Sequence, residues 1–547
     1  MTDAVVIGSG INGLVAANLL ADHGWSVAVF EAAATPGGAV RSAELIEPGF
    51  VNDVCSAFHP LAAASKALGA LHLEEHGLRW RHAPAVLAHP TLDGSCPVLS
   101  RDLDETARSL DGHHQGDGDL WRGLFARWSE HEDVLLSCIL GPFPPVRGAV
   151  RLAASMPPAD LVRFARFALL PVRRLGEEEF GGAAGRLLLA GSALHADLSP
   201  EATLSGFYGW MMTCLGQSFG FPCPEGGAGN LTAALVRRLE SKGGSVTCDA
   251  SVREVPVDRG AAMGVVLGDG TEVRSLRAVL ADVNAPMLYR RLVGREHLPS
   301  TLFSDLDRFQ WDDATFKLDW TLDEPIPWTA PGARSAGTLH VADDVDALTV
   351  VSSELARSLV PARPFLLVGQ MATADPTRQP PGTETAWAYT HVPRRVKGDA
   401  GGEISGTWDH DDSQRFADRI EAQIERLAPG FGALIRGRHI LTPVTFEEEN
   451  PNLSSGAING GTAQLHQQLV FRPVPGLGRA ETPVSRLFLA SSSAHPGGGV
   501  HGACGANAAH AAIAADRRTR VGQLFRRTLR RAPRPPALPS PAPSQAS

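Results

Sequence analysis

The stretch Asp3–Arg41, DAVVIGSGINGLVAANLLADHGWSVAVFEAAATPGGAVR, carries the most informative local pattern in the chain. Ala4–Ile7 is a short, mostly β-branched apolar run that ends at a glycine, as a buried parallel strand does. The turn Gly8–Gly13 then opens an apolar helix. A second apolar run, Ser26–Phe30, ends at Glu31. The pattern predicts a strand, a tight turn, a helix and a second strand.

The turn has the spacing GxGxxG of dinucleotide-binding units. Its first glycine permits the turn, its second lets backbone approach a pyrophosphate, and its third lets helix and strand pack closely. The start of the helix offers free N–H groups and a positive dipole end to phosphate oxygens. Glu31 follows at the distance where a carboxylate accepts hydrogen bonds from ribose hydroxyls, and it disfavours a 2′-phosphate. The expected contact residues are Gly8, Ser9, Gly10, Asn12, Gly13 and Glu31.

Length and composition narrow the class of protein. A chain of 547 residues predicts more than one core, and two domains are the natural expectation. A hydrophobic content of 44% and a charged content of 20% are ordinary for a soluble globular protein. The net charge of −9 gives no reason to expect a nucleic acid partner. The sequence contains no uninterrupted apolar run long enough to predict a transmembrane helix.

The seven cysteines form no CxxC pair and no metal-ligand spacing, so neither a redox disulfide nor a metal site is predicted. Their odd number and scatter are typical of a reducing compartment. Because the first residues lead straight into the nucleotide-binding strand, we expect no signal peptide and a cytoplasmic location.

A second glycine turn follows Glu31 and contains Gly37 and Gly38 before Arg41. The planar guanidinium of Arg41 suits pyrophosphate or flavin oxygens. An N-terminal GxGxxG, an acid at the end of the second strand and a GG-x-x-R turn together resemble the FAD-binding half of the flavoprotein superfamily that includes amine oxidases and phytoene desaturases. The resemblance implies FAD as the cofactor and Gly38 and Arg41 as contacts.

Two later segments extend this resemblance. Residues 221–286 run through a P-x-GG loop, a helix, a strand, a DG hairpin and a strand, similar to the middle FAD segment of the superfamily, which implies a backbone contact at Val252. Residues 495–509 read HPGGGV-x-G-x-x-G-x-N-A-A and closely resemble the C-terminal flavin motif of phytoene desaturase-related proteins. Amine oxidases carry G-x-E where this chain has Ser491–Ser493. The implied flavin contacts here are Ser491, Gly498, Gly499 and Val500.

The matched segments predict an α/β fold with a discontinuous Rossmann-like FAD-binding domain, formed by residues 1–70, 221–295 and 481–516. Residues 71–220 and 296–480 are expected to form a substrate domain with an antiparallel sheet and helices, the former segment mainly helical, with helices expected near 103–110, 120–140, 159–175 and 186–196. The arginine-rich and then proline-rich residues 517–547 predict a disordered tail.

Two surface features leave alternatives open. Residues 139–174 combine apolar residues with arginines, which suits either a peripheral membrane contact or a helical cover over the substrate cavity, and the cover is the favoured interpretation. The arginine-rich tail suits a membrane or partner contact, or simply a solvated end, and the solvated end is the commoner case.

Three residues are candidates for catalysis. Lys317 lies on the alternating strand Ala314–Leu322 and resembles the amine oxidase lysine that holds a water at the flavin N5. The alternative is a solvent-facing lysine paired with a neighbouring carboxylate. His59 lies in a polar segment that passes the flavin in phytoene desaturase-like proteins, and His495 lies in the C-terminal motif. His59 can instead satisfy backbone groups of its loop.

The sequence predicts an FAD-dependent oxidoreductase, phytoene desaturase-like, that removes hydride from a hydrophobic small molecule and is re-oxidised by oxygen or a quinone. A flavin-assisted, non-redox isomerase is the alternative within catalysis. A non-catalytic FAD-containing interaction protein is the alternative outside it. The substrate and the oligomeric state do not follow from the sequence.

Overall fold

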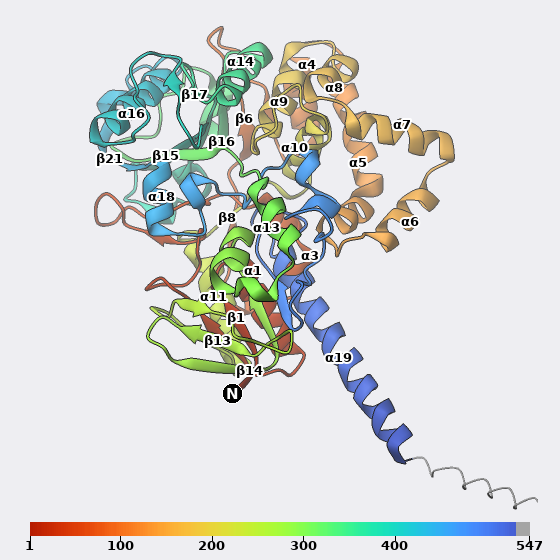
Figure 1. Ribbon diagram of the computed structural model, residues 1–547. Coiled ribbons are helices and arrows are strands. Elements are labelled where there is room, and N and C mark those ends of the chain that lie inside the picture. The colour runs from red at the N-terminus through yellow and green to blue at the C-terminus, as the bar shows by residue number, and fades with distance from the viewer. Residues whose placement is uncertain (532–547) are drawn as a thin grey trace, which may run out of the picture.

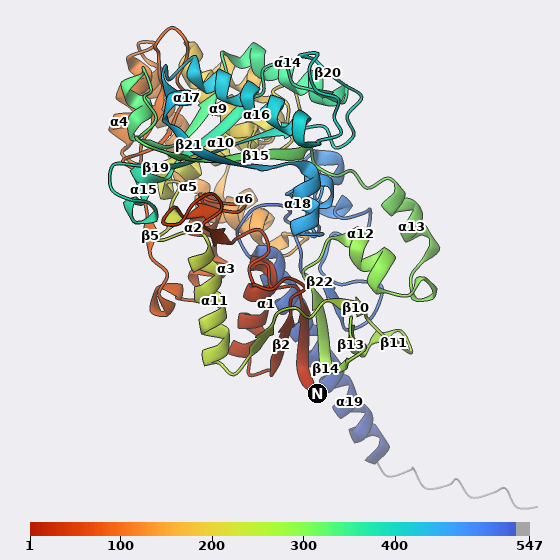
Figure 2. The same cartoon turned by 90° about the vertical axis from the view of Figure 1, so that its left-hand side faces the viewer.

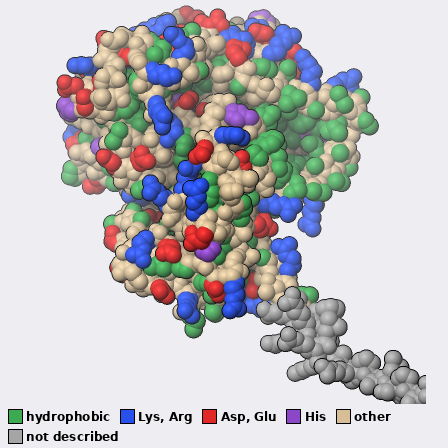
Figure 3. All heavy atoms as spheres, viewed as in Figure 1, with side chains coloured by type: hydrophobic (Ala, Val, Ile, Leu, Met, Phe, Trp, Pro, Cys, Tyr) green, Lys and Arg blue, Asp and Glu red, His purple; other side chains and the backbone are tan. Residues whose placement is uncertain are grey.

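The computed structural model describes residues 1–531. Figures 1 and 2 show one sheet that ends near the N-terminus and a second that lies across the opposite end of the molecule, with helices packed around both. On the face seen in Figure 3, charged side chains of both signs are interspersed.

The first sheet contains the predicted N-terminal unit. Its central strands pair in parallel, and the first half of its longest strand, β14, turns back in an antiparallel hairpin. Strands from three distant stretches of sequence therefore form one sheet. In spatial order they are β10 (Val252–Glu254), β13 (Gly264–Leu267), β14 (Glu272–Ala281), β1 (Thr2–Ile7), β2 (Val27–Phe30) and β9 (Ser245–Thr247), and β22 (Leu487–Leu489) pairs with β14.

Three helices cover this sheet. Helix α1 (Ile11–Asp22) packs against both α11 (Gly229–Ser241) and α19 (Ala503–Arg531). A methyl group at Gly505 would lie 1.8 Å from the carbonyl oxygen of Asn12, so only glycine lets α19 begin this close to α1. The start of α19 is thereby fixed beside the first glycine turn.

The second sheet is antiparallel except for one parallel pair, β16 with β6. In spatial order it contains β21 (Ile435–Leu441), β15 (Ala314–Leu322), β19 (Glu384–Val392), β18 (Leu366–Gln370), β16 (Ala336–Val341), β6 (Ala85–Ala88) and β7 (Val98–Leu99). Along β15, Phe316, Leu318 and Trp320 join a core with α16 (His410–Glu425). Because side chains alternate along a strand, Thr315, Lys317 and Asp319 face the other way.

Seven helices between residues 103 and 219 bury a second core around Trp121, Trp128 and Trp210. They are α4 (Leu103–Asp111), α5 (Asp117–Leu140), α6 (Val146–Ser155), α7 (Pro158–Leu169), α8 (Val172–Glu179), α9 (Ala183–Ala193) and α10 (Ser205–Phe219). The helices not yet named, apart from the single-turn 3-10 and π segments, are α2 (Pro60–Ala64), α3 (Lys66–Gly69), α12 (Ala285–Met287), α13 (Ser300–Asp307), α14 (Val345–Ala356), α15 (Met371–Ala374), α17 (Phe431–Leu434) and α18 (Pro443–Glu449). Short strand pairs join β3 (Ser42–Ala43) to β4 (Asn52–Asp53), β5 (Trp80–Arg81) to β8 (Cys223–Pro224), β11 (Val257–Asp258) to β12 (Ala261–Ala262) and β17 (Leu359–Val360) to β20 (Gly398–Asp399).

The predicted fold class, a Rossmann-like α/β protein with an added antiparallel sheet and helices, is confirmed. Three local predictions are wrong. The helix expected over 159–175 is two helices, because Pro171 lacks an N–H group and separates α7 from α8. Strands β6 and β7 come from the segment that was expected to be mainly helical.

The third error concerns the tail. Residues 517–531 continue α19 as a helix, since arginine is a good helix former and Arg520 pairs with Asp516 one turn earlier. The remainder of the predicted tail, 532–547, lies outside the described residues. Within residues 1–531, no helix has both the length and the apolar character that crossing a bilayer requires.

Candidate active site

A cavity of about 730 Å³ lies between the two sheets. Residues of the glycine turns line one side of it, among them Gly8, Gly10 and Asn12. Side chains of the second sheet, including Lys317 and Tyr389, line the other. The structure thus brings the predicted dinucleotide contacts and the predicted catalytic lysine to one continuous space.

The first glycine turn contacts a carboxylate, Asp282, that the sequence motifs do not include. Asp282 follows β14 and accepts a 2.8 Å hydrogen bond from the Gly13 N–H at the start of α1. A methyl group at Gly10 would lie 2.6 Å from this carboxylate, so the turn needs glycine there. Burial raises the pKa of Asp282 to about 7. The missed signal was an acid directly after an apolar strand in the middle FAD segment.

Glu31 holds the turn from the other side. Its carboxylate accepts hydrogen bonds from the Ser9 N–H at 2.8 Å and the Ser9 hydroxyl at 2.7 Å. The other oxygen accepts a 2.9 Å bond from the Ala33 N–H. Glu31 itself lines the cavity, whereas Ser9 lies behind it. The residue therefore both fixes the turn and faces the space where a ribose would be bound.

Most of the other predicted cofactor contacts also line the cavity. Arg41 does so while its Nε donates to the Gly38 carbonyl at 2.9 Å. Three predicted contacts, Ser9, Gly13 and Ser491, are not among the lining residues. The Ser491 hydroxyl accepts a hydrogen bond from the Ser493 N–H, and Ser492 lines the cavity instead. The predicted contacts found in the lining are Gly8, Gly10, Asn12, Glu31, Gly38, Arg41, Val252, Gly498, Gly499 and Val500.

These residues fit a dinucleotide. The Oδ1 atom of Asn12 is buried and has no hydrogen-bond partner among the described residues, although it belongs to a lining side chain. The first N–H groups of α1 also lack intrahelical acceptors, as at any helix start. Gly10 and Gly37 form a backbone bridge that brings the two glycine turns together without side chains between them. The start of α1 therefore offers N–H donors and room for a pyrophosphate, and the Asn12 Oδ1 can accept a hydrogen bond from a hydroxyl or ring N–H of the dinucleotide.

Lys317 is buried in the cavity wall and carries a counter-charge. Its Nζ donates to the Asp53 carbonyl at 3.0 Å and to both oxygens of Asp319, one of them at 2.5 Å. Only 2% of Lys317 is exposed, so the prediction that it faces solvent is wrong. The prediction that it pairs with a neighbouring carboxylate is confirmed by Asp319. Burial raises the pKa of Asp319 even though Lys317 opposes that shift.

The two predicted catalytic histidines differ in position. His59 lines the cavity, its Nε2 has no hydrogen-bond partner in the described structure, and burial lowers its pKa to about 4. A neutral imidazole with a free nitrogen therefore faces the cavity at pH 7. His495 is not in the lining; its ring packs edge-on against Phe143. The structure does not bring His495 together with Lys317 and His59.

Two histidines that the sequence does not predict as neighbours form a pair at the cavity wall. The Nε2 atoms of His195 and His340 are 2.7 Å apart, and His195 lines the cavity. Burial lowers the pKa of His195 to about 3 and places that of His340 well below its usual value. One neutral ring must therefore donate to the other. These histidines are far apart in sequence and have no motif, so only the fold reveals the pair.

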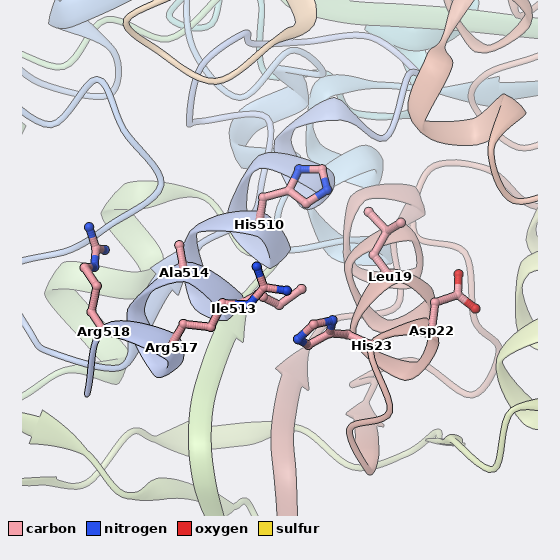
Figure 4. Close-up of a pocket in the computed structure, with 8 residues that line it drawn as sticks. All are labelled: Leu19, Asp22, His23, His510, Ile513, Ala514, Arg517 and Arg518. Carbon is pink, nitrogen blue, oxygen red and sulfur yellow. The ribbon is translucent and has the colours of Figure 1, made fainter. Parts of the chain in front are cut away.

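A second pocket, of about 530 Å³, lies between the end of α1 and α19 (Figure 4). Its lining contains none of the predicted site residues: it consists of Leu19, Asp22, His23, His510, Ile513, Ala514, Arg517 and Arg518. Among residues 1–531, no cluster of histidine, cysteine and acidic side chains could hold a metal ion. The site chemistry is therefore assigned to the larger cavity.

Comparisons with known proteins agree with this geometry. The NAD(P)-binding Rossmann-like domain family matches residues 6–70. The chain is 29% identical to mouse pyridine nucleotide-disulfide oxidoreductase domain-containing protein 2, over 93% of this chain and 92% of that protein. It is 26% identical to the neurosporene-forming phytoene desaturase of Cereibacter sphaeroides, over 94% of both chains. A solved structure of putrescine oxidase shares the fold, with a TM-score of 0.59 and 17% identity over 94% of this chain and 99% of the other.

Proposed function

We propose that the substrate of this chain, an FAD-dependent oxidoreductase of the superfamily that includes phytoene desaturases and amine oxidases, is an apolar small molecule from which hydrogen is removed. The observation that carries the proposal is the composition of the cavity wall opposite the glycine turns. Residues from the second sheet and the helical segment on this wall are mainly apolar or aromatic. The apolar and aromatic ones are Tyr208, Met212, Leu367, Trp387 and Tyr389, with Phe58 and Phe221 from neighbouring loops; the polar ones are His195, Thr315, Lys317 and Thr338.

The charges on this wall favour a neutral substrate. The cation of Lys317 is neutralised by Asp319 behind it. The residues of the second sheet that line the cavity are Thr315, Lys317, Thr338, Leu367, Trp387 and Tyr389, and none of these described residues is acidic. Glu448 and Glu449 of α18 also line the cavity, and Glu449 lies 3.9 Å from Arg41. A substrate ammonium held against the second sheet would still lack a carboxylate partner on that sheet, and burying an unpaired charge is costly. An apolar molecule meets no such penalty.

The chain would hold FAD with its two glycine turns, Glu31, the start of α1 and residues 498–500. When bound, FAD supplies a ring that accepts a hydride from carbon. The aromatic wall would orient the substrate and exclude water. The buried Lys317–Asp319 pair would fix a polar point on this wall, and the free Nε2 of His59 would accept a hydrogen bond from a polar group of the substrate. Oxygen or a quinone is proposed as the final electron acceptor.

Anaerobic incubation tests this function. Purified holoprotein is mixed with a panel of unsaturated and saturated apolar compounds, and the flavin absorbance is followed with product analysis. We expect bleaching of the flavin in step with formation of a dehydrogenated product. An isomerised product without lasting bleaching would instead support the isomerase. Rapid bleaching by primary amines, with none by any apolar compound, would contradict the proposal.

A further inference from the structure

Helices α6 and α7 carry apolar stripes that face solvent. On α6 the stripe consists of Val146, Ala149, Val150 and Ala153, and on α7 of Pro158, Val162, Ala165 and Leu169, all of them exposed. The spacing places each set along one side of its helix. Val162 is 70% exposed and Val150 is 63% exposed, values among the highest for large apolar residues in the described part of the chain. We call these eight residues the outer stripes.

The opposite sides of both helices are already packed. Phe164 and Phe167 of α7 contact Trp210 of α10, with ring centroids 6.3 Å and 5.0 Å apart. On α6, Gly148 is buried against Cys138 of α5. The outer stripes therefore do not belong to the core of this domain. Figure 3 shows apolar side chains gathered over this part of the surface, where Figure 1 places α6 and α7.

The charges beside the stripes are basic. Arg147 and Arg151 are exposed on α6, and no carboxylate lies within ion-pair distance of either among the described residues. The arginines of α7 are paired, Arg163 with Asp160 and Arg166 with Glu178. Asp160 is the only acid in residues 139–174. An exposed apolar stripe with unpaired arginines beside it suits anionic headgroups above an apolar layer.

We propose that the outer stripes of α6 and α7 dock this protein on the surface of an anionic lipid bilayer. The apolar side chains would enter the boundary between headgroups and acyl chains, and Arg147 and Arg151 would bind lipid phosphates. This mode of attachment needs no membrane-spanning helix. It also replaces the favoured sequence interpretation of this segment as a cavity cover, because neither stripe lines the cavity.

The outer stripes lie near the cavity, so docking on a bilayer would also bring the site close to apolar molecules dissolved there. This consequence rests on the proposed function. Helix α10 contacts α7 through Trp210 and also carries Tyr208 and Met212, which line the cavity. One helix layer thus separates the lipid surface from the substrate wall. An apolar substrate dissolved in the bilayer would be delivered close to the site.

Vesicle flotation of the full-length holoprotein tests the docking. We expect it to float with vesicles of phosphatidylcholine plus phosphatidylglycerol, and much less with phosphatidylcholine alone. Val146→Asp/Val150→Asp/Val162→Asp should abolish flotation. The matched control, Leu276→Asp/Val350→Asp, changes residues that are 57% and 56% exposed on other elements and should float like the parent. Flavin content and circular dichroism confirm that each variant is folded.

A second variant separates charge from apolar contact. Each basic residue near an anionic surface contributes about 1 kcal/mol, so Arg147→Gln/Arg151→Gln should weaken binding to the anionic vesicles about 30-fold. The same variant should leave the weak binding to phosphatidylcholine unchanged. Failure of the parent to float with either vesicle overturns the proposal. So does a dimer in gel filtration that the triple aspartate variant dissociates, since the stripes would then bind a second copy. Neither result bears on flavin reduction, so the proposed function is tested separately.

Discussion

Replacing Lys317 by methionine tests whether the lysine is a buried half of an ion pair in the cavity wall. Its Nζ contacts both oxygens of Asp319, and the two side chains are 2% and 1% exposed. Lys317→Met keeps the length of the side chain and removes the charge. Asp319 is then a buried carboxylate without its cation, and breaking a buried pair in this way costs about 3–5 kcal/mol. The surface pair of Arg436 with Asp323 provides the contrast, at about 0–1 kcal/mol.

The stability lost in Lys317→Met should depend on pH. Burial raises the pKa of Asp319 in the folded parent, and loss of Lys317 removes an opposing influence, so the shift grows in the variant. A carboxyl whose pKa is higher in the folded state disfavours folding above its unfolded pKa, and this penalty is relieved as the pH falls and the group is protonated. Thermal melts should therefore place Lys317→Met furthest below the parent at pH 8 and closer to it at pH 5.

Lys317→Met/Asp319→Asn is the matched control, because it removes both charges and leaves none uncompensated. We expect it to regain most of the lost stability at pH 8, to retain FAD and to re-oxidise more slowly with oxygen if Lys317 assists that step. Equal stability of the single and double variants at pH 8 would refute the argument for a buried, paired lysine.

Three further predictions follow from other contacts. Glu31→Arg should lose FAD on gel filtration, because it places a cation against Ser9 and the ribose side of the cavity. The control Glu44→Arg changes an exposed acid and should keep the flavin. Full FAD occupancy in Glu31→Arg would contradict the dinucleotide assignment. Arg378→Met should lower the free energy of unfolding by about 3–5 kcal/mol because it strands the buried carboxylates of Asp53 and Asp375, and a change below about 1 kcal/mol in denaturant melts would count against this. His340→Phe should gain stability relative to the parent as the pH falls below about 6.5. The pKa of His340 is well below its usual value in the folded parent, so the unfolded chain takes up the proton first and the parent loses stability. Melting temperatures of the two proteins that change in parallel from pH 7.5 to 5 would be inconsistent with a buried neutral His340.

Local sequence predicted much of the nucleotide-binding side. Short-range signals, namely glycine spacing and strand alternation, predicted three features correctly. These are the turn from Gly8 to Gly13, the position of Glu31 at the end of its strand, and the strand Ala314–Leu322. The C-terminal limit of α19 could not be predicted, because an arginine-rich sequence suits both a solvated end and a helix.

The long-range contacts of the site were beyond sequence reasoning. Asp282 reaches Gly13 across 269 residues of chain, and His195 reaches His340 across 145. Neither pair forms a motif, and an acid after a strand or a histidine after a helix is common. The partner of Lys317 was predictable from alternation, whereas its burial depends on how the second sheet packs over the cavity.

We expect the aromatic and apolar half of the cavity to hold the molecule that reduces the flavin. Met212 lines this half from α10 and is 4% exposed, so Met212→Trp should fill part of it without contacting the predicted cofactor residues. The measurement is the anaerobic rate of flavin bleaching by the best apolar reductant, for the parent and for Met212→Trp at equal FAD content. We expect the variant to keep its FAD and to lose at least about 10-fold in that rate, a barrier increase of about 1.4 kcal/mol. An unchanged rate with FAD fully bound would contradict it.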